Sequence, residues 1–295
     1  MKQSVALLAA SCLMSCAGFA HAQEEKISPV VPAAPDDEAA LESTRVAELD
    51  FLEKVTPNGV SLGIGMLVSK GILLGEDART FVVPTVGYVG ERVFITGISG
   101  GVHLLKRDGF AINALLSARL DGWNADDLSI ERLAAAGIDR NLLVNRKNEL
   151  DAGFRASWKG DWGKLNLDTT ADASGASNGY SIAMTYRAAF AFRGGAIVPN
   201  VGISYWSDDL GNYYYGTLPQ EVAAGVTSYQ PGSAIVPNLG VTFLRSMPRD
   251  WLFFGGVDYR WLNDDILDSP IVDPDARNGL PSVFFGFSRS FGKIH

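Results

Sequence analysis

The sequence has few of the residues that build disulfides, thiolate metal sites and histidine-dependent catalytic sites. It contains two cysteines, Cys12 and Cys16, and three histidines among 295 residues. Both cysteines fall within the first 22 residues, so a chain without that segment has no thiol at all. Disulfides and cysteine-ligated metals are thereby excluded, and only His103 and the terminal His295 remain as candidate catalytic bases.

Long hydrophobic runs are also missing beyond the N-terminus. The first 22 residues contain one lysine, an apolar run from Val5 to about Phe19, and the sequence Ala20-His21-Ala22. These features predict a secretory signal peptide, cleaved between Ala22 and Gln23. The alternative is lipidation at Cys16, because "LMSC" loosely resembles a lipobox. After residue 22, no uninterrupted apolar run approaches the roughly 18 residues that a membrane-spanning helix needs.

Positive charge is in deficit as well. The chain has 25 basic and 33 acidic residues, a formal net charge of −8, which argues against a nucleic-acid partner. No segment matches a phosphate-binding loop or a dinucleotide fingerprint, so we expect no cofactor. The sequence therefore predicts an exported, acidic protein without thiols.

Residues 23 to 57 form a tether rich in Pro, Ala and Glu. The stretch "PVVPAAP" cannot hold regular structure, because proline lacks a backbone donor and restricts the residue before it. Asp36 or Asp37 can cap a helix that runs to about Val55. This helix is either a partner-binding element or part of a solvated, partly helical linker, and we favour the linker.

From Gly59 onward, segments of about ten residues alternate apolar and polar side chains, separated by clusters of Gly, Asp and Asn. In "NELDAGFRASWKG" the even positions from Leu150 to Trp158 are apolar, and the odd positions are polar, charged or glycine. This period of two predicts β-strands. We expect twelve strands, at residues 59–69, 80–89, 91–98, 101–107, 109–121, 148–158, 161–173, 179–190, 196–207, 233–246, 250–263 and 281–291.

Long and short connections mostly alternate along these twelve segments. Amphipathic strands of this length, with long loops at one end and tight turns at the other, are typical of outer-membrane β-barrels. We therefore predict an all-β fold, a closed antiparallel transmembrane β-barrel of about 12 strands, within a range of 10 to 14, in the cell outer membrane. A soluble β-sandwich is the alternative. The expected regions are a signal peptide (1–22), a periplasmic linker (23–57) and the barrel (58–295).

The last expected strand, "VFFGFSRSF", ends in aromatic residues. Phe285, Phe287 and Phe291 share one face with Val283, as in the last strand that the barrel-assembly machinery recognises. Arg289 interrupts this lipid-facing row, and we expect it to reach the membrane boundary by snorkelling. Outer-membrane lipid and lipopolysaccharide are the surroundings expected for such a surface.

One catalytic motif needs consideration. "GISGG" matches the G-x-S-x-G nucleophile elbow with Ser99 at its centre, but that elbow requires a helix after the serine. Here a short strand and a turn follow, and His103 is the only internal histidine of the mature chain. We expect the glycines to serve a tight turn or bulge, and Ser99 not to be catalytic.

Acidic pairs and adjacent tyrosines mark the long connections. Asp126-Asp127, Asp208-Asp209 and Asp264-Asp265 either bind divalent ions or form solvated loops, and we favour solvated loops. Tyr213, Tyr214 and Tyr215 form either a recognition surface or part of an aromatic girdle at the membrane boundary, with the girdle slightly favoured.

A short segment recurs in the sequence. It reads "AIVPNVGISY" at 196–205, "AIVPNLGVTF" at 234–243 and, with weaker similarity, "VVPTVGY" at 82–88. Each copy separates apolar residues on one face from Asn, Thr, Ser or Gly on the other. The spacing between the copies is irregular, so no repeat architecture is indicated. We interpret each copy as one spanning strand, whose proline lies near a rim or bulge where a lost ladder donor is tolerable.

The chain resembles the MipA/OmpV family of outer-membrane proteins over nearly all of residues 59 to 291. The specific elements are "YYYG" with Tyr214, Tyr215 and Gly216, and "DSPIV" with Asp268, Ser269 and Pro270, in that order before the last strand. The resemblance implies a barrel that is not an enzyme. A named family member is a scaffold linking a murein lytic transglycosylase to a penicillin-binding protein, and others are associated with osmoadaptation, adhesion and antigenicity.

Two classes of function follow, and a third has weaker support. The first is a scaffold or anchor for murein-remodelling enzymes, or an envelope-stress or adhesion protein. The second is a porin-like channel for small solutes through a mixed-sign lumen, and the third is an outer-membrane hydrolase. The alternation predicts that the lumen is lined by Glu149, Asp151, Arg155, Lys164, Asp168 and Arg187.

Overall fold

The computed structural model describes residues 60–119, 121–276 and 279–291. The expected signal peptide, its cleavage site at Ala22 and Gln23, and the tether at 23–57 lie outside these residues, as does the C-terminal segment 292–295. Predictions for those segments therefore stay predictions.

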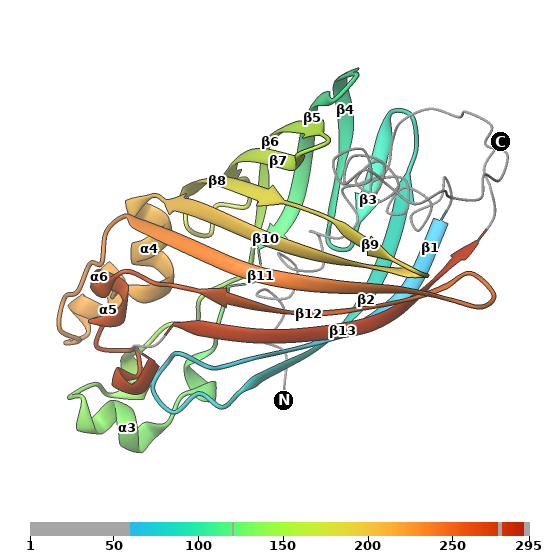
Figure 1. Ribbon diagram of the computed structural model, residues 1–295. Helices are drawn as coiled ribbons and strands as arrows, with labels where there is room; N and C mark the ends of the chain where they lie inside the picture. Colours follow the sequence, from blue (N-terminus) through green and yellow to red (C-terminus); the bar gives the residue numbers. More distant parts are fainter. Residues whose placement is uncertain (1–59, 120, 277–278, 292–295) are drawn as a thin grey trace, which may run out of the picture.

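The described chain is a closed antiparallel β-barrel (Figure 1). Neighbours around the sheet follow the order β11-β12-β13-β1-β2-β3-β4-β5-β6-β7-β8-β10-β9, and pairing of β10 with β11 closes it. All twelve predicted strands are present, with ends shifted by a few residues. The strands are β1 (Val60–Ser69), β2 (Arg79–Val89), β3 (Val93–Thr96), β4 (Ser99–Arg107), β5 (Phe110–Arg119), β6 (Glu149–Gly160), β7 (Gly163–Asp172), β8 (Tyr180–Arg187), β9 (Phe190–Phe192), β10 (Gly195–Trp206), β11 (Ala234–Met247), β12 (Trp251–Arg260) and β13 (Leu280–Phe291).

One predicted strand, 179–190, is interrupted. β8 and β9 pair with β10 in the same register, and the gap between them lies opposite Pro199. The Ala188 amide donates to the Pro199 carbonyl (3.2 Å), but proline has no N–H with which to return the bond. The proline of the first repeated segment therefore interrupts the ladder within the barrel wall. Pro237 has an equivalent place at the end of the β11–β12 ladder, where its carbonyl accepts from the Trp261 amide.

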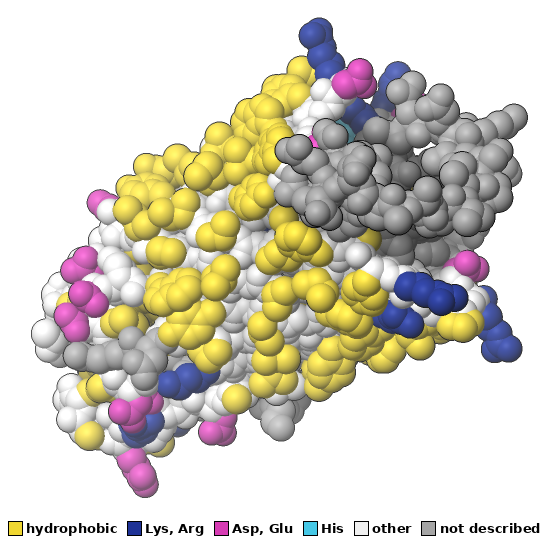
Figure 2. All heavy atoms as spheres, in the orientation of Figure 1, with side chains coloured by type: hydrophobic (Ala, Val, Ile, Leu, Met, Phe, Trp, Pro, Cys, Tyr) yellow, Lys and Arg dark blue, Asp and Glu magenta, His cyan; other side chains and the backbone are white. Residues whose placement is uncertain are grey.

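The outward side chains form a continuous apolar band over the strands. Figure 2 shows hydrophobic side chains along the strand-covered side, with most acidic residues at one end and basic residues at the other. Alternating residues of the two full-length repeats, such as Val201, Ile203 and Leu239, are about half exposed. The predicted lipid-facing and lumen-facing rows are confirmed by the burial pattern of these strands.

Inward residues divide the lumen into an apolar and a charged side. Leu67, Phe81, Phe254 and Phe284 are buried on the β1, β2, β12 and β13 wall. Phe254 pairs with Gly286, and Phe284 pairs with Gly256 on the same two strands. A Cβ on Gly286 would lie 2.4 Å from the Phe254 ring. The inward rings therefore occupy the space that the glycines leave by having no side chain.

The long connections gather at one end of the barrel and the tight turns at the other (Figure 1). The long connections contain α3 (Ile130–Ala135), α4 (Asp208–Tyr215), α5 (Pro219–Ala223), α6 (Asp264–Leu267) and the 3-10 turns η1 (Ala125–Asp127), η2 (Arg140–Leu142) and η3 (Pro274–Ala276). None of the helices among the described residues is long and apolar enough to cross a membrane. We call this packed set of connections, residues 70–78, 121–148, 207–233 and 261–276, the cap. Its buried residues include Leu73, Leu133, Leu210, Ile266 and Ile271, so the cap has a hydrophobic core of its own.

Candidate functional site

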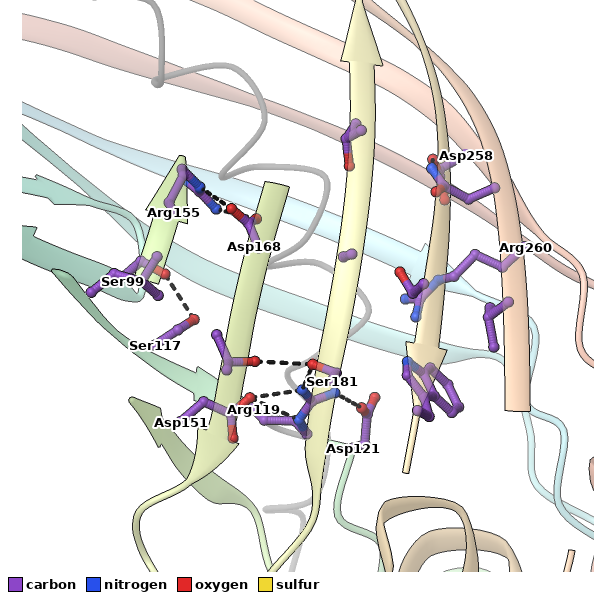
Figure 3. Close-up of a pocket in the computed structure, with 18 of the residues that line it drawn as sticks. Ser99, Ser117, Arg119, Asp121, Asp151, Arg155, Asp168, Ser181, Asp258 and Arg260 are labelled. Atoms are coloured by element: carbon purple, nitrogen blue, oxygen red, sulfur yellow. Dashed lines mark hydrogen bonds and ion pairs between the residues drawn. The ribbon is translucent and has the colours of Figure 1, made fainter. Parts of the chain in front are cut away.

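The barrel encloses a cavity of about 200 Å³ in its charged side, next to the cap. Arg119, Trp206 and Arg260 line it, and each is the last residue of its strand at the cap end. Four arginines and four aspartates line the cavity together with serine, threonine and asparagine side chains. We call it the lumenal cavity. Figure 3 shows Arg155 and Asp168 on one side of it, and Asp258 and Arg260 on the other.

Arg119 holds together the acidic part of the lumenal cavity. Its guanidinium lies 2.7 Å from Asp151, 2.8 Å from Glu149 and 3.5 Å from Asp121. It also donates to the Ser181 hydroxyl at 3.0 Å. These contacts join β5 to the adjacent strand β6, where the inward rows face one another across the ladder, and to β8, which lies beyond β7 in the sheet.

The deeper part of the charged wall is richer in basic residues. Arg155 makes a bidentate pair with Asp168, at 2.6 and 2.8 Å, across the β6–β7 ladder. Lys164 and Arg187 are directly opposite each other on β7 and β8, and both are buried. All six residues predicted to line the lumen point inward. Sequence alternation therefore identified the charged wall, but not which residues pair within it.

Two of the repeated segments are paired with each other in this wall. In the β10–β11 ladder Asn200 is opposite Gly240 and Gly202 is opposite Asn238. The Asn238 amide donates to the Asn200 amide oxygen (3.2 Å), and a Cβ on Gly202 would lie 2.4 Å from the Asn238 side chain. The third copy follows the same rule on β1 and β2, where Thr85 is opposite Gly63 and Ser61 is opposite Gly87. The repeat thus places a small polar side chain beside a glycine-sized space on the neighbouring strand.

A buried ion pair fixes the cap. The Arg146 guanidinium contacts both carboxylate oxygens of Glu221, at 2.7 and 2.9 Å, and both side chains are fully buried. The same guanidinium donates to the carbonyls of Tyr213 (2.6 Å) and Gly216 (3.0 Å) and lies 4.7 Å from the Trp123 ring centroid. Sequence reasoning missed both residues, and their only signal was the position of Glu221 in "YYYGTLPQE".

The three adjacent tyrosines are packed within the cap, so the expectation of a membrane-boundary girdle is wrong. Tyr214 is buried on α4, its hydroxyl donates to the Lys147 carbonyl (3.2 Å), and Tyr215 stacks on Trp206 at 6.3 Å. Burial is the main reason that the pKa values of both phenols are raised above the ordinary tyrosine value. The tyrosines form the last turn of α4, a helix whose first turn is capped by Ser207, because the Ser207 hydroxyl accepts from the Leu210 amide.

The other family-like residues meet the same helix. Ser269 donates to the Tyr215 carbonyl, which brings the "DSPIV" segment against "YYYG". Gly216 ends α4, and a Cβ there would lie 2.6 Å from the Asn212 carbonyl. Asp268 follows α6, and Pro270 lies in the same connection. The two motifs that carried the family resemblance are therefore neighbours in one packed cap.

Ser99 lies in a hairpin, as the sequence predicted, and not in a nucleophile elbow. Gly97 has a positive φ of 59° in the β3–β4 turn, and Ser99 begins β4 without a following helix. The Ser99 hydroxyl donates to Ser117 (2.7 Å). His103 is four residues further along the same strand, roughly 13 Å away at the usual rise per residue, and its Nδ1 contacts Asn113 (2.6 Å). The described residues also contain no group of three or more His, Cys, Asp or Glu that is arranged to hold a metal ion.

The lipid-facing row of β13 is as predicted. Val283, Phe285, Phe287 and Phe291 are all exposed on the outer surface of the barrel. Arg289 lies near the turn end of this row, paired with Trp251 in the ladder, and its guanidinium is 5.3 Å from the Phe291 ring centroid. This position, beside an exposed tryptophan at the end of β12, is consistent with the boundary location expected for a snorkelling arginine.

Comparison with known proteins agrees with this architecture. The family described as MltA-interacting protein MipA matches residues 62–291. The chain belongs to the MipA family. It is 27% identical to the MltA-interacting protein of Escherichia coli K12 over 216 residues, which cover 72% of this chain and 84% of that protein. It is also 27% identical to the outer membrane protein OmpV of Vibrio cholerae, over 71% of this chain and 79% of that one.

Solved barrels give a more distant comparison. The NanC porin superposes with a TM-score of 0.45 at 7% identity, covering 78% of this chain and all of that one. Family membership, the closed barrel and its apolar band together make this MipA-family chain an outer-membrane β-barrel. The predictions of the MipA/OmpV family, the fold and the outer-membrane location are therefore confirmed.

Proposed function

We propose that this MipA-family barrel is a non-enzymatic outer-membrane anchor, whose periplasmic end holds murein-remodelling enzymes, a lytic transglycosylase and a penicillin-binding protein. The observation that carries the proposal is the kinship with a protein named for its interaction with MltA, over 84% of that relative's length. In barrels of this class the short turns are periplasmic and the long loops extracellular. The partner surface would therefore be the turn end, which also carries the start of β1 and the end of β13.

The turn end has a charge suited to an acidic partner. Its turns and adjoining strand ends hold nine basic residues against four acidic ones, whereas the long connections hold fifteen acidic against six basic. The basic residues are Arg92, Lys106, Arg107, Lys159, Lys164, Arg193, Arg245, Arg249 and Arg289. Electrostatic complementarity of this kind raises association rates and selects partners.

The test is a pull-down with the purified full-length barrel as bait and a purified lytic transglycosylase or penicillin-binding protein as prey. We expect retention of at least one enzyme, weakened by the double variant Arg92→Glu/Arg249→Glu. Lys147→Glu in the cap is the matched control and should leave retention unchanged. Loss of residues 23–57 measures the contribution of the tether separately. Failure of the intact barrel to retain either enzyme would contradict the proposal.

A second candidate is passage of small solutes, which the charged lumen and its cavity favour. The Arg119 and Arg155 ion pairs narrow this lumen, and the cap packs next to it. Single-channel steps in planar bilayers would support conduction, and a consistently silent bilayer would exclude it. The hydrolase alternative fails if Ser99→Ala leaves any measured hydrolysis intact.

A further inference from the structure

We propose that the lumenal cavity is a binding site for a small hydroxylated carboxylate of about the size of a sugar acid, with Arg260 as the residue that recognises the carboxylate. This inference is independent of the anchor role, because it concerns the lumen and not the periplasmic surface. It rests on the distribution of charge, on one arginine and on the polar wall built by the repeated segments.

The charges that line the lumenal cavity balance overall but not locally. Five of the eight belong to two ion-paired groups, Arg119 with Asp121 and Asp151, and Arg155 with Asp168. The other three are Arg187, Asp258 and Arg260, with a formal sum of +1. Arg187 on β8 and Asp258 on β12 make further contacts of their own, which leaves Arg260 as the charge of this set that can receive one negative charge from a ligand.

Arg260 is the distinctive residue of this set. Within the part of the chain that the structure describes, its guanidinium makes no ion pair and no hydrogen bond. In Figure 3 its side chain extends from β12 into the cavity. A guanidinium has five donors in a planar fork that matches a carboxylate. Arg119 and Arg155, by contrast, already make such contacts with aspartates.

The neighbouring wall offers hydrogen-bonding groups for hydroxyls. Asn200 and Asn238 line the cavity beside Arg260, and Gly202 and Gly240 leave room for their amides. Ser204 and the Trp206 ring complete this wall, and Tyr215 stacks on Trp206 and so holds the indole in place. An aromatic plane beside amides, hydroxyls and one arginine suits a ligand that has an apolar ring face, several hydroxyls and a single carboxylate. The volume of about 200 Å³ limits the ligand to a single small molecule.

The experiment is isothermal titration calorimetry on the full-length barrel in detergent micelles. D-glucuronate is the probe, and D-glucose is its uncharged counterpart with a similar ring. Inorganic phosphate tests for a simple anion site. We expect glucuronate to bind, glucose not to bind and phosphate to bind more weakly than glucuronate. Absence of glucuronate binding, or equal binding of glucose or of phosphate, overturns the assignment.

Variants test whether glucuronate binds at Arg260 in the lumenal cavity. Arg260→Gln should weaken glucuronate binding by at least about tenfold, the usual loss when a charge-assisted hydrogen bond is removed. Arg260→Lys should be intermediate, because an ammonium keeps the charge but not the fork. Asn200→Ala should weaken binding by a smaller factor. Arg245→Gln, an outward-facing arginine at the turn end, is the control and should bind as the parent does. Equal affinity of the parent and a folded Arg260→Gln or Arg260→Lys overturns the role of Arg260.

Discussion

Arg146 and Glu221 are separated by 75 residues and form a bidentate ion pair in which both side chains are fully buried. Each belongs to a different long connection, so this pair joins two parts of the cap. Arg146 also satisfies the carbonyls of Tyr213 and Gly216. The "YYYGTLPQE" motif is therefore a structural element of the cap, and Arg146 organises it.

Removing one partner of this pair should loosen the cap. Glu221→Gln or Arg146→Met leaves the other charge buried, at a cost of about 3–5 kcal/mol. We expect faster proteolysis within residues 121–148 and 207–233, while the barrel keeps its heat-modifiable gel migration. Arg132→Met is the control: Arg132 is half exposed where it pairs with Asp273, so its loss should cost no more than about 1 kcal/mol. Equal protease resistance of parent and Glu221→Gln would contradict this account.

The glycines beneath the inward phenylalanines should not tolerate a methyl group. In Gly286→Ala the new Cβ would meet the Phe254 ring at 2.4 Å, and backbone atoms of Ile64 and Gly65 lie within 2.8 Å. We expect a loss of about 1–3 kcal/mol from overpacking, measured by urea unfolding in micelles. Gly255→Ala is matched on the neighbouring strand and has no atom closer than 3.3 Å. A loss in Gly255→Ala as large as that in Gly286→Ala would refute the role of the Phe–Gly pairs.

Alkaline pH should destabilise the cap through Tyr214. Burial raises the pKa of this phenol in the folded protein, so folding favours its neutral form. The resulting stability is fully present below the unfolded value of about 10 and is lost as the pH rises from there through the folded pKa. Limited proteolysis of the cap at increasing pH measures this loss. Tyr214→Phe cannot ionise and should show a weaker pH dependence, although it loses the hydrogen bond to Lys147.

The exposed end of β13 should contribute to assembly more than to stability. Phe291 is 46% exposed on the lipid-facing row, so Phe291→Ala removes little packing within the protein. We propose that it weakens recognition by the barrel-assembly machinery, and we expect a lower yield of folded barrel in the outer membrane. Unfolding of the purified protein should be nearly unchanged. Val257→Ala, on the lipid-facing row of β12, is the control, and an equal loss of yield there would show a general effect of the apolar band.

Local pattern was sufficient to predict the barrel wall. The alternation of side chains along each strand is a property of consecutive residues, so it gave all twelve strands, the lipid-facing rows and the six inward charged residues. It also placed Ser99 in a hairpin. The gap between β8 and β9 follows from the missing backbone donor of Pro199 on β10. Which residues fall in this gap depends on how the two strands are paired.

Contacts between distant segments had no such signature. The folded cap, the burial of Tyr214 and the Arg146–Glu221 pair join loops whose apolar residues follow no regular period, so their sequences do not show which loops pack together. The sequence likewise shows the repeated Pro-Asn-x-Gly segments but not that they are adjacent. Asn200 opposite Gly240 depends on the register of β10 against β11, and that register is set when the barrel closes. Sequence by itself determined the strands and the face of each residue, because these depend on neighbours in the chain. Tertiary structure decided the cap, the lumenal cavity and the position of Arg260 in that cavity, because these depend on which distant residues closure brings together.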